Sequence, residues 1–180
     1  MNRMQCSIFV RMLKGGIFYG MLLITLPIFG QRTLEKIMEK MAYKDVPLAT
    51  VTEIAVNPSY LRLDTREREE FEVSHLQDAH YIGYSDFDAS EFIEHFPDKD
   101  ATYVVYCSVG VRSEKIGKKL IDMGYTDVKN LSGGMFKWIN EGYDVVDSTG
   151  RETQKVHAYN RFWGLLLNKG EKVYGPVKQE

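Results

Sequence analysis

The sequence predicts an α/β fold, a mostly parallel central sheet with helices on both faces. Short β-branched and apolar stretches alternate along the chain with segments whose apolar residues recur at helical spacing. The connections between these segments are short, and no repeat or low-complexity segment interrupts the alternation. Because βα alternation with short connections places successive strands in parallel, these observations predict a parallel sheet that is covered on both sides.

Helices and strands are expected in alternation from residue 50 onward. The expected helices cover residues 50–56, 67–72, 89–96, 113–121 and 135–141. The expected strands cover residues 61–64, 79–82, 103–106 and 128–131. Thr50 can cap the first helix, and Pro97 ends the third because proline cannot continue a helix. The fourth helix is apolar at Ile116, Leu120 and Ile121, and the strand before it is β-branched and apolar, as buried strands are.

Cys107 ends the strand expected over residues 103–106, and a loop containing Gly110 then turns into a helix. Ligands of open α/β sheets bind beyond the carboxyl ends of the strands. The N–H groups of the loop and the positive end of the helix would favour an anion there, including a thiolate nucleophile. An inert core cysteine is the ordinary alternative, but Arg112 adds positive charge. We therefore interpret Cys107 as a nucleophile.

These residues resemble the active loop of the rhodanese family of sulfurtransferases, a cysteine followed by four residues and then often by Arg and by Ser or Ala. The resemblance spans about residues 43–147, with three further motifs in the family's order. The first covers residues 60–71, where a strand ends in Asp64-Thr65-Arg66-Glu67 before a short helix, and the second is His75-Leu76-Gln77-Asp78-Ala79. The third covers residues 124–134, which include Asn130 and end in Ser132-Gly133-Gly134, and is followed by Trp138 and Gly142. Ser74 stands where the family usually has glycine. The resemblance implies a rhodanese-like domain over residues 43–147.

The resemblance also implies a reaction. The Cys107 thiolate would attack the sulfane sulfur of a donor such as thiosulfate, expel sulfite and keep the sulfur as a persulfide. Cyanide or a thiol would then accept it, and no metal or organic cofactor is needed. The expected substrate-binding residues of the loop are Ser108, Val109, Gly110, Val111, Arg112 and Ser113. Their N–H groups would surround the negative outer sulfur.

Four charged residues near the loop require interpretation. Arg112 is expected to contact the anionic donor, the alternative being an ion pair with an acid beside the loop. Asp64 and Arg66 are expected to support the loops as an ion pair at the end of a strand, the alternative being a part in catalysis. Glu70 stands nearest to the position where two-domain rhodaneses have a further substrate-contacting Arg, which leaves the donor open.

Two other classes of function stay open. Phosphatases and arsenate reductases of similar architecture have a Cys-x5-Arg loop. In this sequence four residues separate Cys107 from Arg112, and the smaller Cys-x4-Arg ring suits a single sulfur. A non-catalytic module that binds a partner or carries sulfur is the other alternative, although such modules often lack the cysteine.

Residues 1–30 predict a cleaved signal peptide. Arg3, Arg11 and Lys14 precede an apolar stretch that is shorter than the roughly 20 apolar residues a membrane span needs. Cleavage is expected after Gly30, which predicts an exported, periplasmic protein. An uncleaved N-terminal membrane anchor is the alternative. Residues 31–42 are expected to form a polar lead-in.

Removal of residues 1–30 would leave one domain of 150 residues and change the net charge from −2 to −5. Cys107 would then be the sole cysteine. The absence of a basic face argues against nucleic acid, and the four histidines lack the spacing of metal ligands. The expected partners are a small anionic sulfur donor and a thiol or cyanide acceptor, and the protein is expected to be a monomer.

Residues 148–180 form a C-terminal extension beyond the domain. The stretch over residues 156–167 is too apolar for a solvated tail and too short to span a bilayer. We expect Phe162, Trp163 and Leu166 to pack against the domain's own helices, the alternative being contact with a partner or a second copy.

Overall fold

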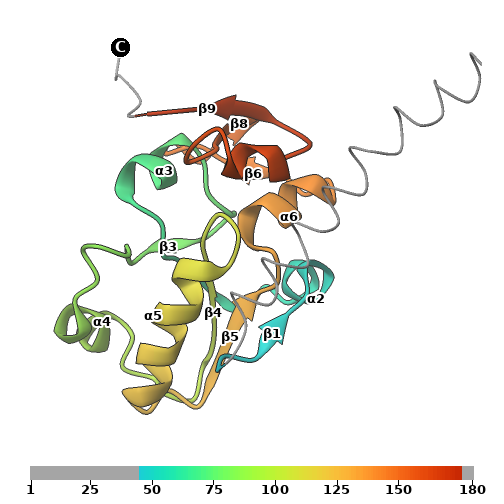
Figure 1. Ribbon diagram of the computed structural model, residues 1–180. Helices are drawn as coiled ribbons and strands as arrows, with labels where there is room; N and C mark the ends of the chain where they lie inside the picture. Colours follow the sequence, from blue (N-terminus) through green and yellow to red (C-terminus); the bar gives the residue numbers. More distant parts are fainter. Residues whose placement is uncertain (1–44, 176–180) are drawn as a thin grey trace, which may run out of the picture. The chain divides into compact units, whose positions relative to one another are not determined.

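Within residues 45–175, five parallel strands form the central sheet in the order β1-β5-β4-β2-β3 (Figure 1). The strands are β1 (Leu48–Ala49), β2 (Leu61–Asp64), β3 (His80–Tyr81), β4 (Thr102–Tyr106) and β5 (Asp127–Leu131). Asp64 of β2 pairs with Tyr106 of β4, so the two strands end at the same level. Cys107 therefore leaves the sheet at its carboxyl edge.

The computed structural model describes residues 45–175, which belong to one compact unit. The expected signal peptide over residues 1–30 and the lead-in over residues 31–42 lie outside the described residues. Within the described part of the chain, none of the helices has the length and apolar character that crossing a membrane requires.

Helices pack on both faces of the sheet, as the sequence predicts. They are α2 (Val51–Val56), α3 (Arg68–Val73), α4 (Ala89–His95), α5 (Val111–Asp122) and α6 (Gly134–Asn140). Val105 packs with Ile116 of α5 and Phe92 of α4 on one face. On the other face, Arg62 of β2 donates to the Ile54 carbonyl of α2 at 3.3 Å. Both faces are therefore covered, and the predicted fold class is confirmed.

Local interactions set where the helices begin. Thr50 Oγ1 accepts a hydrogen bond from the Glu53 N–H at 3.1 Å and caps α2, as expected. α3 begins one residue later than expected because Glu67 is its N-cap, and the Glu67 N–H donates to Glu70 Oε2 at 3.1 Å. α5 begins at Val111, before the expected residue 113, because Gly110 is its N-cap.

The C-terminal extension folds onto the domain through three short strands and a 3₁₀ helix. They are β7 (Glu152–Thr153), which pairs with β6 (Val145–Val146), then β8 (Lys155–His157), η1 (Trp163–Leu166) and β9 (Glu171–Val173), which pairs with β8. Val156, Leu166 and Leu167 are buried. Asn140 of α6 donates to the Leu166 carbonyl at 2.7 Å, which joins the extension to the last helix.

The expectation for the extension's aromatic residues is only partly correct. Leu166 is buried as expected, Trp163 is partly buried, but Phe162 is 54% exposed. Residues three apart in a 3₁₀ helix share a face. Phe162 and Leu165, both exposed, form the outer face of η1, whereas Gly164 and Leu167 form its inner face. The buried contacts are therefore aliphatic rather than aromatic.

Candidate active site

Cys107 lies at the start of a tight loop between β4 and α5, with only 1% of its surface exposed. The Gly110 N–H donates to Cys107 Sγ at 3.1 Å. Gly110 has φ 101° and ψ −7°, a left-handed conformation that glycine adopts without strain. This turn directs a backbone donor at the sulfur, which is the orientation that a negatively charged sulfur requires.

The carbonyl groups of the loop accept hydrogen bonds from α6 and β5. The Met135 N–H donates to the Cys107 carbonyl at 2.9 Å, and the Phe136 N–H donates to the Ser108 carbonyl at 3.0 Å. Asn130 Nδ2 donates to the Gly110 carbonyl at 3.0 Å. In a trans peptide the N–H points opposite to the carbonyl. Each bonded carbonyl therefore points toward its donor in α6 or β5. The N–H of the same peptide group points the opposite way, so this N–H is available to a negative group held by the loop.

Gly134 allows α6 to approach the loop closely enough to make these bonds. Its φ is 59°, and a Cβ at this position would lie 2.4 Å from the Cys107 carbonyl oxygen and 2.7 Å from the Val109 nitrogen. No side chain fits there. The Gly133-Gly134 motif is thus a packing requirement of the active loop as well as a turn.

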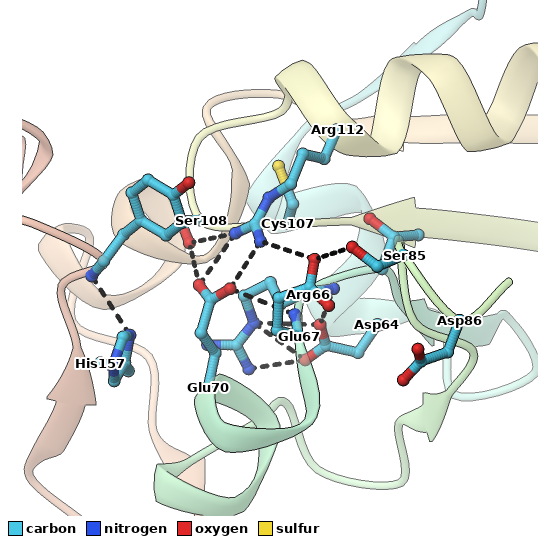
Figure 2. A network of polar contacts seen from close by, with 12 residues as sticks. Asp64, Arg66, Glu67, Glu70, Ser85, Asp86, Cys107, Ser108, Arg112 and His157 are labelled. Atoms are coloured by element: carbon cyan, nitrogen blue, oxygen red, sulfur yellow. Dashed lines mark hydrogen bonds and ion pairs between the residues drawn. The ribbon is translucent and has the colours of Figure 1, made fainter. Parts of the chain in front are cut away.

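Arg112 and Glu70 form a bidentate ion pair beside the cysteine (Figure 2). Arg112 Nη1 lies 2.5 Å from Glu70 Oε2, and Arg112 Nη2 lies 2.8 Å from Glu70 Oε1. Ser108 Oγ donates to Glu70 Oε1 at 2.9 Å. Glu67 Oε1 lies 4.0 Å from Arg112 Nη1. The ion pair with an acid beside the loop, which the sequence left as the alternative for Arg112, is therefore present; contact of Arg112 with the donor stays a prediction.

Both members of this pair are ionised at neutral pH. Burial acts to raise the pKa of Glu70, but the hydrogen bonds and the charge of Arg112 bring that pKa below its usual value of 4.5. Burial acts to lower the pKa of Arg112, but the hydrogen bond to Glu70 and the nearby Cys107 outweigh burial. The pKa of Arg112 is therefore raised above its ordinary value. The positive charge of Arg112 is thus balanced by a carboxylate before any substrate arrives.

Asp64 and Arg66 form a second, fully buried ion pair below the loop. Arg66 Nη2 lies 2.6 Å from Asp64 Oδ2, and the same nitrogen donates to the Ser74 carbonyl at 2.6 Å. These bonds join the end of β2 to the chain that follows α3, which is a supporting arrangement. Ser74, where the family usually has glycine, has φ −170°. Any residue adopts this extended conformation, so the departure causes no strain.

Asn130 and Glu114, to which the sequence assigned no role in the site, hold the far side of the loop. The Ser113 hydroxyl donates to Asn130 Oδ1 at 2.8 Å, and Asn130 Nδ2 donates to Glu114 Oε2 at 3.0 Å. The Ser113 side chain is therefore engaged with the scaffold, which leaves its N–H as the group able to meet a substrate. Asn130 belongs to the closing motif of the sequence, but its role could not be read from that motif because its partners come from a different element.

The C-terminal extension also reaches the site. The Tyr159 ring centroid lies 5.1 Å from the guanidinium carbon of Arg112. The Tyr159 N–H donates to His157 Nδ1 at 3.2 Å. Burial lowers the pKa of His157, so its ring is neutral at pH 7. The sequence singled out this aromatic segment but could not place it beside Arg112.

Residues 45–175 contain no candidate metal site. No group of three or more His, Cys, Asp or Glu side chains there could hold a metal ion. A hollow of about 440 Å³ lies along β3 and α4, and its lining includes neither Cys107 nor the loop after it.

Comparisons with known proteins place these features. The family described as "Rhodanese-like domain" matches residues 50–141. The chain is 36% identical over 87 residues to the "Adenylyltransferase and sulfurtransferase UBA4" of Candida albicans, covering 46% of this chain and 20% of that protein. It is 26% identical over 98 residues to the "Thiosulfate sulfurtransferase GlpE" of Coxiella burnetii, covering 54% of this chain and 89% of that protein. The chain spans about a fifth of the length of the UBA4 relatives.

Solved structures agree with this placement. A thiosulfate sulfurtransferase from Pseudomonas aeruginosa is similar with a TM-score of 0.53 and 25% identity, over 57% of this chain and 20% of that chain. The rhodanese-like domain of the Anabaena sp. Alr3790 protein shares the fold with a TM-score of 0.52 at 17% identity, over 74% of this chain and 93% of that chain. Since the family match covers half of the chain, the protein belongs to the rhodanese-like domain family.

Proposed function

We propose that the protein is a sulfurtransferase that takes sulfane sulfur from thiosulfate or a similar donor onto Cys107 and passes it to a thiophilic acceptor. The arrangement of the active loop carries this proposal. A cysteine stands at the carboxyl edge of the sheet, and a backbone N–H lies 3.1 Å from its sulfur. The carbonyls of Cys107 and Ser108 accept hydrogen bonds from α6, so they point away from the space in which the sulfur is held.

The reaction has two displacements at sulfur. In the first, the Cys107 thiolate attacks the outer sulfur of thiosulfate; a sulfur–sulfur bond forms to Cys107, and the bond to the sulfonate sulfur breaks as sulfite leaves with the electron pair. In the second, cyanide or a thiolate attacks the outer sulfur of the persulfide. The thiolate of Cys107 leaves, and the enzyme returns to its starting state.

The loop would stabilise the intermediate through its backbone. The persulfide carries negative charge on its outer sulfur, one bond beyond Sγ. The Gly110 N–H already donates to Sγ, and we expect the other N–H groups from Ser108 to Ser113 to surround the outer sulfur. Donors that are already in place need not reorganise when the charge arrives. Glu67, Glu70 and Arg112 form the rim of the loop, where Ser108 and Arg112 position the carboxylate of Glu70.

Two features favour sulfur over phosphorus as the reacting atom. Four residues separate Cys107 from Arg112, which makes a ring suited to one sulfur rather than to a tetrahedral oxyanion. The Arg112 guanidinium also binds Glu70 with both terminal nitrogens, which leaves fewer of its N–H groups for a tetrahedral oxyanion.

The turnover assay combines thiosulfate with cyanide and follows thiocyanate. Wild-type protein should form thiocyanate, and Cys107→Ser should abolish it because a hydroxyl is a poor sulfur acceptor at neutral pH. Phe162→Ala, which changes an exposed residue outside the loop, serves as the control and should retain turnover. Turnover that survives in Cys107→Ser would refute the mechanism.

Export is a separate proposal, supported by the basic residues and the apolar stretch of residues 1–30. The mature chain should begin at Gln31 and be found in the periplasm or outside the cell. N-terminal sequencing tests this, and an intact Met1 on the exported protein would favour the membrane anchor instead.

A further inference from the structure

The charge around Arg112 disfavours a dianionic donor. Glu70 pairs with Arg112 through both carboxylate oxygens, and Glu67 lies 4.0 Å from the same guanidinium. The formal charges of Arg112, Glu70 and Glu67 sum to −1. Arg66 adds no free positive charge because Asp64 pairs with it, and His157 is neutral. A thiosulfate dianion would therefore approach a rim that carries no net positive charge (Figure 2).

Tyr159 presents an aromatic surface at this rim. Its ring centroid is 5.1 Å from the Arg112 guanidinium carbon, yet half of the residue is exposed. Its φ is 60°, a left-handed conformation that bulky residues rarely adopt. The backbone on either side is fixed, because the Ala158 N–H donates to the Val173 carbonyl at 2.9 Å and the Tyr159 N–H donates to His157. The fold thus holds an aromatic ring beside the active arginine, with area left for a ligand.

We propose, on the basis of the function proposed above, that the sulfur donor is a monoanionic organic sulfane-sulfur compound, R–S–S⁻ or R–SO₂–S⁻, whose R group packs on Tyr159. Such a donor carries half the charge of thiosulfate, so the carboxylates of Glu67 and Glu70 repel it less. Its R group gains the exposed face of Tyr159, a contact that thiosulfate cannot make, and an aromatic R group gains the most from it.

The chemistry is balanced without a further reagent. The Cys107 thiolate attacks the terminal sulfur, a bond forms between Sγ and that sulfur, and the bond from the terminal sulfur to R–SO₂ or R–S breaks. A sulfinate or a thiolate leaves with the electron pair. Two negative charges enter the step and two leave it, as the Cys107 persulfide and the leaving group.

Three sulfur donors distinguish the effect of donor charge on KM from the effect of an aromatic R group. They are thiosulfate, a dianion; methanethiosulfonate, a small monoanion; and benzenethiosulfonate, an aromatic monoanion. Each is measured with cyanide as the acceptor, and each variant is compared with wild type for the same donor, so that intrinsic reactivity cancels.

Glu70→Gln tests the charge. Glutamine keeps one oxygen that can accept from Ser108 Oγ and Arg112 Nη2. Its NH2 group replaces the oxygen that accepts from Arg112 Nη1 and the Glu67 N–H, so the negative charge and half of the bidentate pair are lost. KM for thiosulfate should fall by about three- to fivefold, and KM for the two thiosulfonates should fall less. Glu53→Gln is the matched control, because it removes the same charge from the ion pair with Lys129, outside the Arg112 network. It should leave all three KM values unchanged.

Tyr159→Gly tests the aromatic contact. Glycine adopts φ 60° readily, so the backbone can stay in place when the ring is removed. KM for benzenethiosulfonate should rise by about three- to tenfold, and KM for methanethiosulfonate should not. Tyr159→Phe should restore the wild-type value. Leu165→Ala, an exposed apolar residue of the same extension, is the control.

A measurement on the wild-type protein accompanies the variants, in case a variant fails to fold. Benzenesulfinate should inhibit sulfur transfer competitively at lower concentration than methanesulfinate or sulfite. Equal inhibition by the two sulfinates, an equal effect of Tyr159→Gly on all three donors, or an unchanged thiosulfate preference in Glu70→Gln would each overturn this inference while sulfur transfer itself stands. If none of the donors forms a persulfide on Cys107, the proposed function fails and this inference fails with it.

Discussion

Glu70 shows how a single residue can change the character of a site without changing its architecture. It caps α3 through the Glu67 N–H, accepts from Ser108 and pairs with Arg112. The same carboxylate therefore stabilises a helix, fixes the loop side chains and sets the charge at the rim. The sequence could identify Glu70 as a departure from the family, but not its partner, because Arg112 is distant in the chain and only the folded sheet brings the two together.

The pH dependence of stability should reveal this pair. The pKa of Glu70 is lower in the folded chain than its usual value of 4.5. A lowered folded pKa means that the stabilisation is present above 4.5 and is lost as pH falls through the folded value. Glu70→Gln should reduce the free energy of unfolding at pH 7 by about 1–3 kcal/mol. Near pH 3 the difference from wild type should shrink, and urea unfolding at both pH values measures it. An equal difference at the two pH values would contradict the assignment.

At the scale of elements, the contact between α6 and the active loop decides whether the loop keeps its shape. Gly134→Ala would place a Cβ 2.4 Å from the Cys107 carbonyl oxygen and push the loop away. We expect sulfur transfer to fall by about 100-fold, since displacements of about 1 Å at a reacting centre have effects of this order. Gly150→Ala is the matched control, because Gly150 also has a positive φ, 78°, but no neighbours within 4 Å. Steady-state kinetics of both variants check this; equal losses would mean that backbone strain, not the clash, is the cause.

The elements differ in how far sequence predicts them. β4 and α5 were predictable because an apolar run and a helical apolar spacing stand next to each other. β1 was not, because two residues carry too little periodicity. β8 and β9 escaped prediction because charged residues such as Lys155 and Lys172 hide a pairing that only the folded extension creates. The bonds from α6 to the loop carbonyls are backbone contacts, so no side-chain pattern announces them.

At the scale of the whole molecule, the C-terminal extension belongs to the fold and reaches the site. Val156, Leu166 and Leu167 are buried against the domain, and Tyr159 lies over Arg112. Burial of three aliphatic side chains contributes about 5 kcal/mol or more. Composition predicted that this segment is not a solvated tail, but the position of Tyr159 beside Arg112 depends on the turn after β8.

Truncation after Asp147 should therefore lower the melting temperature and leave the protein monomeric before and after. Differential scanning calorimetry and size-exclusion chromatography with light scattering measure the two effects. Conversion of a dimer into a stable monomer on truncation would instead identify the extension as an oligomerisation element.

A persulfide at Cys107 is the central intermediate of the proposed reaction. Intact-mass spectrometry of the wild-type protein after treatment with thiosulfate or benzenethiosulfonate should show the addition of one sulfur atom, and peptide mapping should locate it at Cys107. Cyanide should then remove the added mass and release thiocyanate. An unchanged mass with both donors, or a sulfur that persists in Cys107→Ser, would contradict the proposed chemistry.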